Sequence, residues 1–165
     1  MIVRLTQDND LNRVMEIYSI ARQYMKDTGN PNHWKDFWPP EDLIKEEIKN
    51  KISYVIEENN HIYGVFAFFV GHDSTYDLIV DGDWIDRDSE YGVIHRIASS
   101  QERKGIMDET IKYVESIINN VKVDTHFDNI VMQKALERNG FQRCGIISTH
   151  DGSESISYQK ITKKK

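Results

Sequence analysis

Short β-branched runs alternate with amphipathic segments along the chain, and this order constrains the fold more than any other feature of the sequence. Strands are predicted where apolar and β-branched residues cluster between turn residues, over residues 2–5, 53–57, 62–70, 92–98, 121–125, 141–148 and 155–161. Helices are predicted where apolar residues recur at helical spacing, over residues 11–25, from residue 41, up to about residue 119 and over 128–139. The order of these elements predicts an α/β fold built as a single domain of residues 1–165.

The composition places the chain among globular proteins and argues against several functions. The formal net charge is −6 over 165 residues, whereas a nucleic-acid-binding protein usually carries a basic face. The longest apolar run, residues 62–70, is shorter than the roughly 20 residues that a membrane-spanning helix requires. Cys144 is the one cysteine and cannot form an internal disulfide, and no signal peptide is recognisable. We therefore expect a soluble, cytoplasmic protein with no nucleic-acid or membrane partner.

The stretch of residues 91–114 changes from a strand-like run to an amphipathic helix, and Gly105 lies at the change. The Ser-Ser-Gln-Glu sequence at 99–102 contains a capping box, which would start the helix near its own first residues. The other interpretation starts the helix near Gly105 and leaves residues 99–104 as a loop whose backbone N–H groups converge on an anion. A phosphate could approach Gly105 closely because glycine has no side chain. On this stretch alone, both interpretations stay open.

The surrounding segments favour the loop. The chain contains neither G-x-x-x-x-G-K-[ST] nor G-x-G-x-x-G, so it lacks the common nucleotide-binding glycine motifs. It does contain VIHRIASSQERKGIM at 93–107, VDTHFDNIVMQKALERNGFQRCGII at 123–147 and SYQKI at 157–161. In this order and at this spacing, these segments resemble the GNAT family of acyl-CoA-dependent N-acetyltransferases over nearly the whole chain. The resemblance implies a mixed, mostly antiparallel sheet of about seven strands flanked by about four helices.

The resemblance also implies a site for acetyl-CoA between the strand that ends at Ala98 and the strand that ends at Thr125. Backbone groups at the end of the first strand would pair with the pantetheine amides. Backbone N–H groups of the following loop would hold the pyrophosphate, and an N–H near Ile97 would stabilise the oxyanion. The cofactor-binding residues implied in this way are Ile97, Ala98, Ser99, Arg103, Lys104, Gly105, Ile106, Met107, Asn129 and Met132.

Three residues depart from the family's pattern. The family's phosphate loop usually reads Gln/Arg-x-x-Gly-x-Gly/Ala, and alignment on Gly105 places Glu102 first and Met107 last. Glu102 brings an anion to the implied pyrophosphate site, and Met107 is bulkier than Gly or Ala. Leu136 stands where the family often has a tyrosine that protonates the leaving thiolate, and leucine has no such proton. These departures keep an alternative open, namely a catalytically weak acyl-CoA-binding sensor or a protein-interaction module on the same fold.

Two histidines are candidates for the base that removes a proton from the acceptor ammonium, because an unperturbed imidazole titrates near pH 6.5. His95 lies on the strand implied to hold the cofactor, and His126 directly follows the other strand. The alternative for His95 is a histidine packed and hydrogen-bonded within the sheet. The alternative for His126 is a histidine that orients the loop before Asn129. Arg96 is expected to pair with a carboxylate such as Asp124.

The acceptor would approach along residues 27–40 and 72–90. Trp34, Tyr76 and Trp84 are candidates for an aromatic wall against an alkyl amine, and the alternative is that they cover the edge of the core. The second segment is strongly acidic and would attract a cationic acceptor. We expect no metal, because the sequence DGDWIDRDSE lacks the oxygen ligand and the glycine that an EF-hand requires at its fifth and sixth positions.

The resemblance implies an N-acetyltransferase that moves an acetyl group from acetyl-CoA directly to a primary amine, without a covalent enzyme intermediate. Acetyl-CoA is the expected co-substrate. The acceptor is a small-molecule or peptide amine whose identity the sequence leaves open. Sheet edges in such folds often pair, so a homodimer is compatible with the resemblance.

Overall fold

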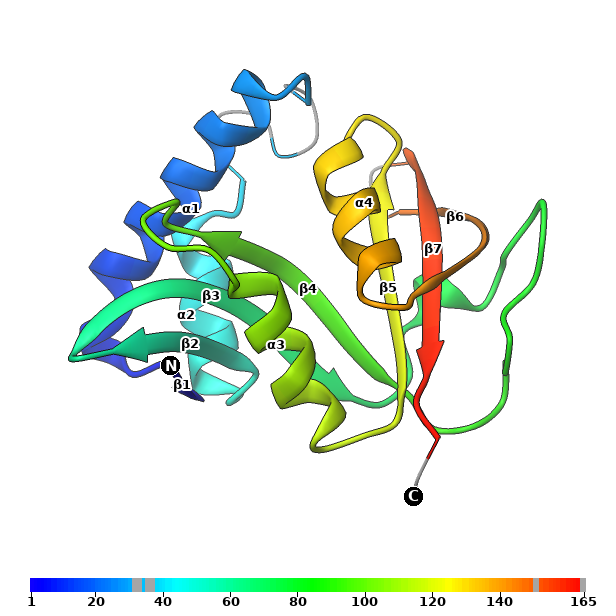
Figure 1. The fold of residues 1–165 in the computed structure, drawn as a ribbon, viewed down its shortest axis with the longest axis horizontal. Helices are drawn as coiled ribbons and strands as arrows, with labels where there is room; N and C mark the ends of the chain where they lie inside the picture. Colours follow the sequence, from blue (N-terminus) through cyan, green and yellow to red (C-terminus); the bar gives the residue numbers. More distant parts are fainter. Residues whose placement is uncertain (31–33, 35–37, 150–151, 164–165) are drawn as a thin grey trace. The chain divides into compact units, whose positions relative to one another are not determined.

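The computed structural model describes residues 1–30, 34, 38–149 and 152–163, so the predicted acceptor segment 27–40 is described only in part. The described elements are β1 (Ile2–Leu5), η1 (Asp8–Asp10), α1 (Leu11–Asp27), α2 (Glu41–Lys49), β2 (Ser53–Glu58), β3 (His61–Val70), η2 (Ser74–Tyr76), β4 (Gly92–Ser99), α3 (Ile106–Glu115), β5 (Asn120–His126), α4 (Ile130–Arg138), β6 (Gln142–Ser148) and β7 (Glu154–Ile161) (Figure 1). None of the helices in these described ranges is long and apolar enough to cross a membrane.

Over the described residues, seven strands form one sheet in the order β1-β2-β3-β4-β5-β7-β6. Pairing is antiparallel between β1 and β2, β2 and β3, β5 and β7, and β6 and β7, and parallel between β4 and β5. The mostly antiparallel sheet and the α/β element order confirm the predicted fold class. The turn between β2 and β3 is the tight hairpin that the pair Asn59-Asn60 favours. Both residues have the positive φ that such a turn requires.

The third predicted helix is shorter than the sequence indicated. We expected it to reach about residue 119, but α3 ends at Glu115. The N–H groups of Ile117 and Ile118 both donate to the carbonyl of Val114 at 3.0 Å, which closes the helix in a turn before β5. The helical spacing of the apolar residues continues past this turn, so the pattern alone overestimated the length.

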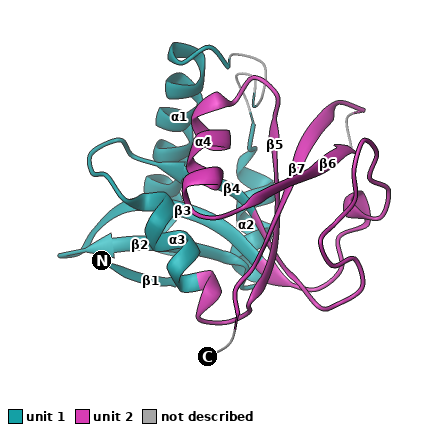
Figure 2. Cartoon of the chain, turned by 45° about the vertical axis from the view of Figure 1, so that its right-hand side comes forward, with its two compact units in different colours: residues 1–68, 95–113 teal, residues 69–94, 114–165 magenta. Residues whose placement is uncertain are grey.

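The chain divides into two compact units, which Figure 2 shows in different colours. Unit 1 comprises residues 1–68 and 95–113, and unit 2 comprises residues 69–94 and 114–165. β3 passes from unit 1 into unit 2, and β4 passes from unit 2 into unit 1. The first residues of β4 pair with β5 within unit 2, with Val93 opposite Lys122.

In unit 1, helices cover both faces of the strands. α1 and α2 pack on one face, where Ile17 and Ile44 meet Val55 in a fully buried cluster. α3 packs on the other face, where the Tyr113 ring lies 5.3 Å from the ring of Tyr54 on β2. The alternation of side chains along β2 and β3 supplies apolar residues to both helix layers.

In unit 2, a long irregular segment adds to the strands. Residues 72–90 include Val80, which forms an antiparallel bridge with Ile146 on β6 and so covers part of that sheet edge. Tyr76, Trp84 and Cys144 share one buried apolar cluster. Burial also raises the pKa of the Cys144 thiol, and the residue packs as a small apolar core residue.

Candidate functional site

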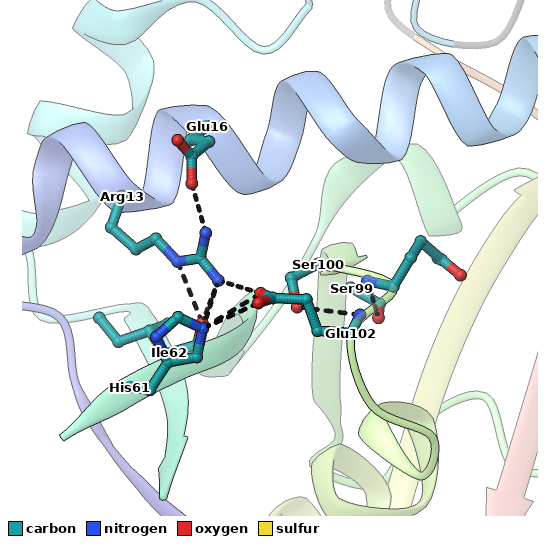
Figure 3. A network of polar contacts seen from close by, with 8 residues as sticks. Arg13, Glu16, His61, Ile62, Ser99, Ser100 and Glu102 are labelled. Carbon is teal, nitrogen blue, oxygen red and sulfur yellow. Dashed lines mark hydrogen bonds and ion pairs between the residues drawn. The ribbon is translucent and has the colours of Figure 1, made fainter. Parts of the chain in front are cut away.

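The segment between β4 and α3 is a loop. α3 begins at Ile106, later than the capping box would place it. The hydroxyl oxygens of Ser99 and Ser100 each accept the backbone N–H two residues further on, at 3.0 and 3.4 Å (Figure 3). The Ser100 N–H donates to the Tyr63 carbonyl at 2.9 Å and ties the loop to β3. The two serines therefore turn a loop instead of capping a helix, and the later helix start is confirmed.

Gly105 lies directly before α3 with a φ of +92°, a conformation that favours glycine. Among the described residues, a Cβ built on Gly105 would meet only Met1 Cε, at 3.9 Å, so the space over this backbone is open. The helical ladder begins when the Glu109 N–H donates to the Gly105 carbonyl at 3.0 Å. The backbone N–H groups of the first turn therefore have no carbonyl partner within the helix. Together with the helix dipole, they favour an anion at this end of α3. A phosphate fits this geometry.

The Glu102 carboxylate is held by partners from α1 and β3 (Figure 3). Arg13 donates to it, and His61 Nε2 lies 3.1 Å from both of its oxygens. Arg13 also donates to the Ile62 carbonyl, at 2.8 and 3.1 Å, and pairs with Glu16. Hydrogen bonding, chiefly from Arg13, lowers the pKa of Glu102 from 4.5 to about 2. The anion that departs from the family's pattern is thus compensated within unit 1.

Glu102→Gln is expected to change how stability responds to acid. Because the folded pKa of Glu102 lies below its ordinary value, the ionised carboxylate contributes stability above pH 4.5, and this contribution is lost as the pH falls through about 2. The stability difference between wild type and Glu102→Gln should therefore be largest above pH 4.5 and should vanish near pH 2. Urea unfolding midpoints across this range measure the difference. If wild type and Glu102→Gln lost the same amount of stability as the pH falls, Arg13 and His61 would not hold the Glu102 carboxylate in solution.

The two cations that follow Glu102 differ in their partners. Arg103 pairs with Glu58 at the end of β2, and its guanidinium carbon lies 5.8 Å from the centroid of the Tyr63 ring. Lys104 is exposed and makes no ion pair within the described part of the chain. Lys104 is therefore the cation that a phosphate could engage directly, whereas Arg103 would first have to leave Glu58.

β4 departs from regular strand geometry at Arg96, whose φ is +53°. The Tyr18 hydroxyl donates to the Arg96 carbonyl at 3.2 Å, and the Arg96 guanidinium pairs with Glu47 on α2. The predicted carboxylate partner of Arg96 therefore exists, but it is Glu47 and not Asp124. Positive φ breaks the side-chain alternation of the strand, which the prediction had assumed. Asp124 instead accepts a hydrogen bond from Tyr76 at 2.7 Å.

Gly64 on β3 positions the start of the loop and of α3, and the sequence analysis missed it. A Cβ at Gly64 would lie 2.7 Å from Ile106 Cγ2 and 3.3 Å from the Ala98 carbonyl oxygen. Only a glycine permits this close approach of β3 to the end of β4 and to the first residue of α3. The available signal was a glycine inside the apolar run 62–70, because glycine in a strand often marks a close backbone approach.

The N-terminus of α4, in unit 2, is ordered by side-chain hydrogen bonds. Asn129 caps the helix, since its Oδ1 accepts the Met132 N–H at 3.1 Å. His126 Nδ1 accepts the Asp128 N–H at 3.1 Å, and Gln133 Nε2 donates to the His126 carbonyl at 3.2 Å. These contacts support the interpretation in which His126 orients the loop before Asn129.

The aromatic candidates for acceptor contact are buried in the cores of the two units. Trp34 is only 7% exposed and packs edge-on against Tyr18, at 5.6 Å between ring centroids. Tyr76 and Trp84 pack together at 5.3 Å, and Trp84 Nε1 donates to the Tyr76 carbonyl at 2.8 Å. These rings have packing roles in the structure, and their contact with an acceptor stays a prediction. Leu136 is fully buried, and as a leucine it has no hydroxyl that could protonate a thiolate.

The remaining candidates are placed as follows. His95 and Ile97 are half-buried on β4, and Ala98 is buried. Met107 is half-buried on the first turn of α3. No group of three or more His, Cys, Asp or Glu side chains that could hold a metal ion is found in the part of the chain that the structure describes.

Solved structures resemble the chain over its full length. A GNAT-family acetyltransferase from Streptococcus agalactiae 2603 has a TM-score of 0.87 and 30% sequence identity, over 99% of this chain and 96% of that one. A GNAT-family acetyltransferase from Listeria monocytogenes 4b F2365 has a TM-score of 0.71 and 20% identity, over 98% and 94%. The structure of yncA from Salmonella typhimurium with its cofactor acetyl-CoA has a TM-score of 0.60 and 15% identity, over 99% and 95%.

No protein-family model and no curated protein sequence matches the chain. The identity and coverage of the Streptococcus agalactiae structure nevertheless decide the family. The chain belongs to the GNAT family of acetyltransferases.

Proposed function

We propose that this protein transfers an acetyl group from acetyl-CoA directly to a primary amine. The observation that carries the proposal is the loop before α3, where Gly105 leaves its backbone open at a helix N-terminus. A diphosphate is the kind of anion that such a terminus binds, because the N–H groups and the helix dipole both favour negative charge. The acetyl-CoA in the yncA structure supports a CoA thioester as the ligand.

The proposed contacts with acetyl-CoA are those that the resemblance to the GNAT family implies. In unit 1, the N–H groups of residues 103–107 hold the pyrophosphate, and Lys104 adds a free positive charge. The backbone of residues 97–99 pairs with the pantetheine amides in the way that an added strand pairs with a sheet edge. In unit 2, Asn129 and Met132 are assigned to the thiol end.

The proposed reaction needs one well-placed backbone donor. The amine nitrogen attacks the thioester carbonyl, an N–C bond forms, the C–S bond breaks, and CoA leaves as its thiolate. The Ile97 N–H stabilises the oxyanion that forms at the carbonyl. The neighbouring residue, Arg96, is held by Tyr18 and Glu47, which restricts the peptide that carries this N–H. A donor fixed in advance needs little reorganisation as charge develops.

His95 is assigned as the base because of its position on β4, the strand proposed to hold the cofactor. His126 Nδ1 accepts the Asp128 N–H, so in the neutral ring the proton resides on Nε2 and the lone pair is already engaged. His95 is half-buried on β4 beside Arg96 and is the remaining candidate on that strand. Because Leu136 cannot protonate the leaving thiolate, the proton is assigned to solvent or to the protonated base.

The first test is calorimetric titration of acetyl-CoA into the wild type, Gly105→Trp and Gly29→Trp. Gly29 is the matched control, because it also has positive φ and a Cβ there would meet nothing within 4 Å among the described residues. We expect micromolar binding by the wild type and by Gly29→Trp, and no binding by Gly105→Trp, whose side chain would fill the proposed phosphate site. Absence of binding to the wild type at millimolar acetyl-CoA would overturn the proposal.

The second test asks whether bound acetyl-CoA reacts. Release of free thiol is measured while a panel of primary amines is offered to the wild type at saturating acetyl-CoA. We expect at least one amine to accelerate thiol release well above the hydrolysis rate. Tight binding without acceleration by any amine would favour the alternative of an acyl-CoA-binding sensor, for which the fully buried Leu136 is the supporting observation.

A further inference from the structure

Lys122, on β5 in unit 2, is a buried cation that makes no ion pair with any residue that the structure describes. The residue is 1% exposed, and its Nζ lies 4.0 Å from the centroid of the Tyr91 ring and 4.4 Å from that of the Trp84 ring. Its hydrogen bond to the Arg87 carbonyl is long, at 3.4 Å. No carboxylate lies within ion-pair distance of this ammonium in the described ranges of the chain.

This arrangement leaves positive charge only partly compensated. A buried charge is costly unless an opposite charge or several hydrogen bonds offset the lost hydration. The two aromatic faces and one carbonyl offset part of that cost. Burial lowers the pKa of Lys122, and the nearby carboxylate of Asp86 opposes this only in part. An anion supplied from outside the chain would therefore be stabilised here.

A cavity of about 470 Å³ is lined by Lys122, together with Gly71, Tyr76 and Tyr91. Its volume lies within the range of small-molecule sites, whose walls typically combine apolar and aromatic side chains with a few charged or polar groups. Every lining residue belongs to unit 2. None of the residues assigned above to acetyl-CoA or to proton transfer lines this cavity.

The exposed side of the same cavity carries three carboxylates besides His72 and Arg87, and Arg87 is paired with Asp83 at 2.5 Å. Asp77, Asp88 and Glu90 line it, and Asp77 is already paired with His72 at 2.5 Å. Asp88 and Glu90 are exposed and make no ion pair with another residue of the described chain. These carboxylates would repel a multiply charged anion and would attract an ammonium group. Because Arg87 and Asp77 have partners of their own among the described residues, the cavity presents a buried positive charge at Lys122 and two exposed negative charges at Asp88 and Glu90.

We propose that this cavity binds a small amino acid zwitterion, with its carboxylate at the Lys122 ammonium and its ammonium at the rim formed by Asp88 and Glu90. The carboxylate of such a ligand meets the buried positive charge, and its ammonium meets the exposed negative charges. A ligand with a carboxylate alone satisfies only the buried part. Citrate, with several negative charges, opposes the rim.

Thermal unfolding of the full chain in the absence of acetyl-CoA tests this site independently of acetyl transfer. Alanine is the probe, and acetate, citrate and sodium chloride at matched ionic strength are the comparisons. We expect alanine to raise the unfolding temperature by about 5–10 °C at a concentration 100-fold above its dissociation constant, acetate to raise it less, and citrate to resemble chloride. No rise with alanine up to 100 mM (on the order of weak metabolite binding), or a larger rise with citrate, would overturn the proposal.

Variants test the two ends of the ligand separately. Lys122→Met keeps the length of the side chain and removes the charge, so the response to both alanine and acetate should disappear. The exposed Lys134→Met is the matched control and should respond as the wild type does. Asp88→Asn changes an exposed side chain that makes no ion pair with the described residues, and it should weaken the alanine response while the acetate response stays. An unchanged alanine response in Asp88→Asn together with Glu90→Gln would overturn the assignment of the rim, even if Lys122→Met did not fold.

Discussion

Glu47→Ala is expected to lower the free energy of unfolding by about 3–5 kcal/mol, because it removes one partner of a buried ion pair. Glu47 is 3% exposed on α2 and pairs with Arg96 on β4. Arg96 Nε has no hydrogen-bond partner among the residues that the structure describes, so the guanidinium is already incompletely satisfied before its carboxylate is removed. Urea unfolding, with both the midpoint and its slope, measures the loss.

The matched control for this prediction is Glu46→Ala. Glu46 is the preceding residue on α2 and is exposed, so its loss should change stability by no more than about 0.5 kcal/mol. The double variant Glu47→Leu with Arg96→Leu should cost less than Glu47→Ala alone, because no buried charge is then left unpaired. A loss below 1 kcal/mol (about the value of an exposed pair) for Glu47→Ala would show that the pair is hydrated in solution.

Gly82→Ala is expected to destabilise the protein by about 2–5 kcal/mol, although Gly82 itself is exposed. A Cβ at Gly82 would lie 1.9 Å from the Cys144 carbonyl oxygen on β6, a distance that no rotamer can relieve. Its φ of +153° adds a backbone cost for any residue with a side chain. The segment that carries Gly82 is held against β6 by the bridge from Val80 to Ile146, so it cannot move away without breaking that bridge.

Gly29→Ala separates the cost of the steric clash at Gly82 from the cost of placing a residue with a side chain at positive φ. Gly29 has a φ of +87°, and a Cβ there would meet nothing within 4 Å in the described structure, so only the backbone cost of about 1 kcal/mol applies. The difference in destabilisation between Gly82→Ala and Gly29→Ala, measured by thermal unfolding, is the part caused by the clash with the Cys144 carbonyl oxygen. Equal losses in Gly82→Ala and Gly29→Ala would mean that the segment of residues 72–90 does not lie against β6 in solution.

The element order of the fold could be predicted from local patterns because those patterns are physical requirements of single elements. The pair Asn59-Asn60 favours a tight hairpin, and both residues have the positive φ that such a turn needs. The loop before α3 could not be decided in this way. A capping box and a phosphate loop share the same residues, and the choice depends on the hydrogen bond from the Ser100 N–H to Tyr63 on another strand.

The partners of the charged residues were the least predictable part of the candidate site. Glu102 meets Arg13, which lies 89 residues earlier, and His61, which lies 41 residues earlier. Arg96 meets Glu47 because its own positive φ turns the side chain away from the regular strand direction. No local pattern encodes either encounter, because long side chains pair with whatever opposite charge the packed elements bring within reach.

The amino-acid sequence by itself determined the family resemblance, the order of helices and strands, and the position of Gly105 at a strand-to-helix change. These depend on neighbours within a few residues, whose steric and hydrogen-bonding requirements act along the chain. Only the tertiary structure decided that Arg13 and His61 hold the Glu102 carboxylate and that Gly64 allows α3 to approach β3 closely. It also decided that Lys122 is buried without an ion pair among the described residues. Those properties depend on distances across the packed units, because electrostatic compensation and close packing arise between residues that are remote in sequence.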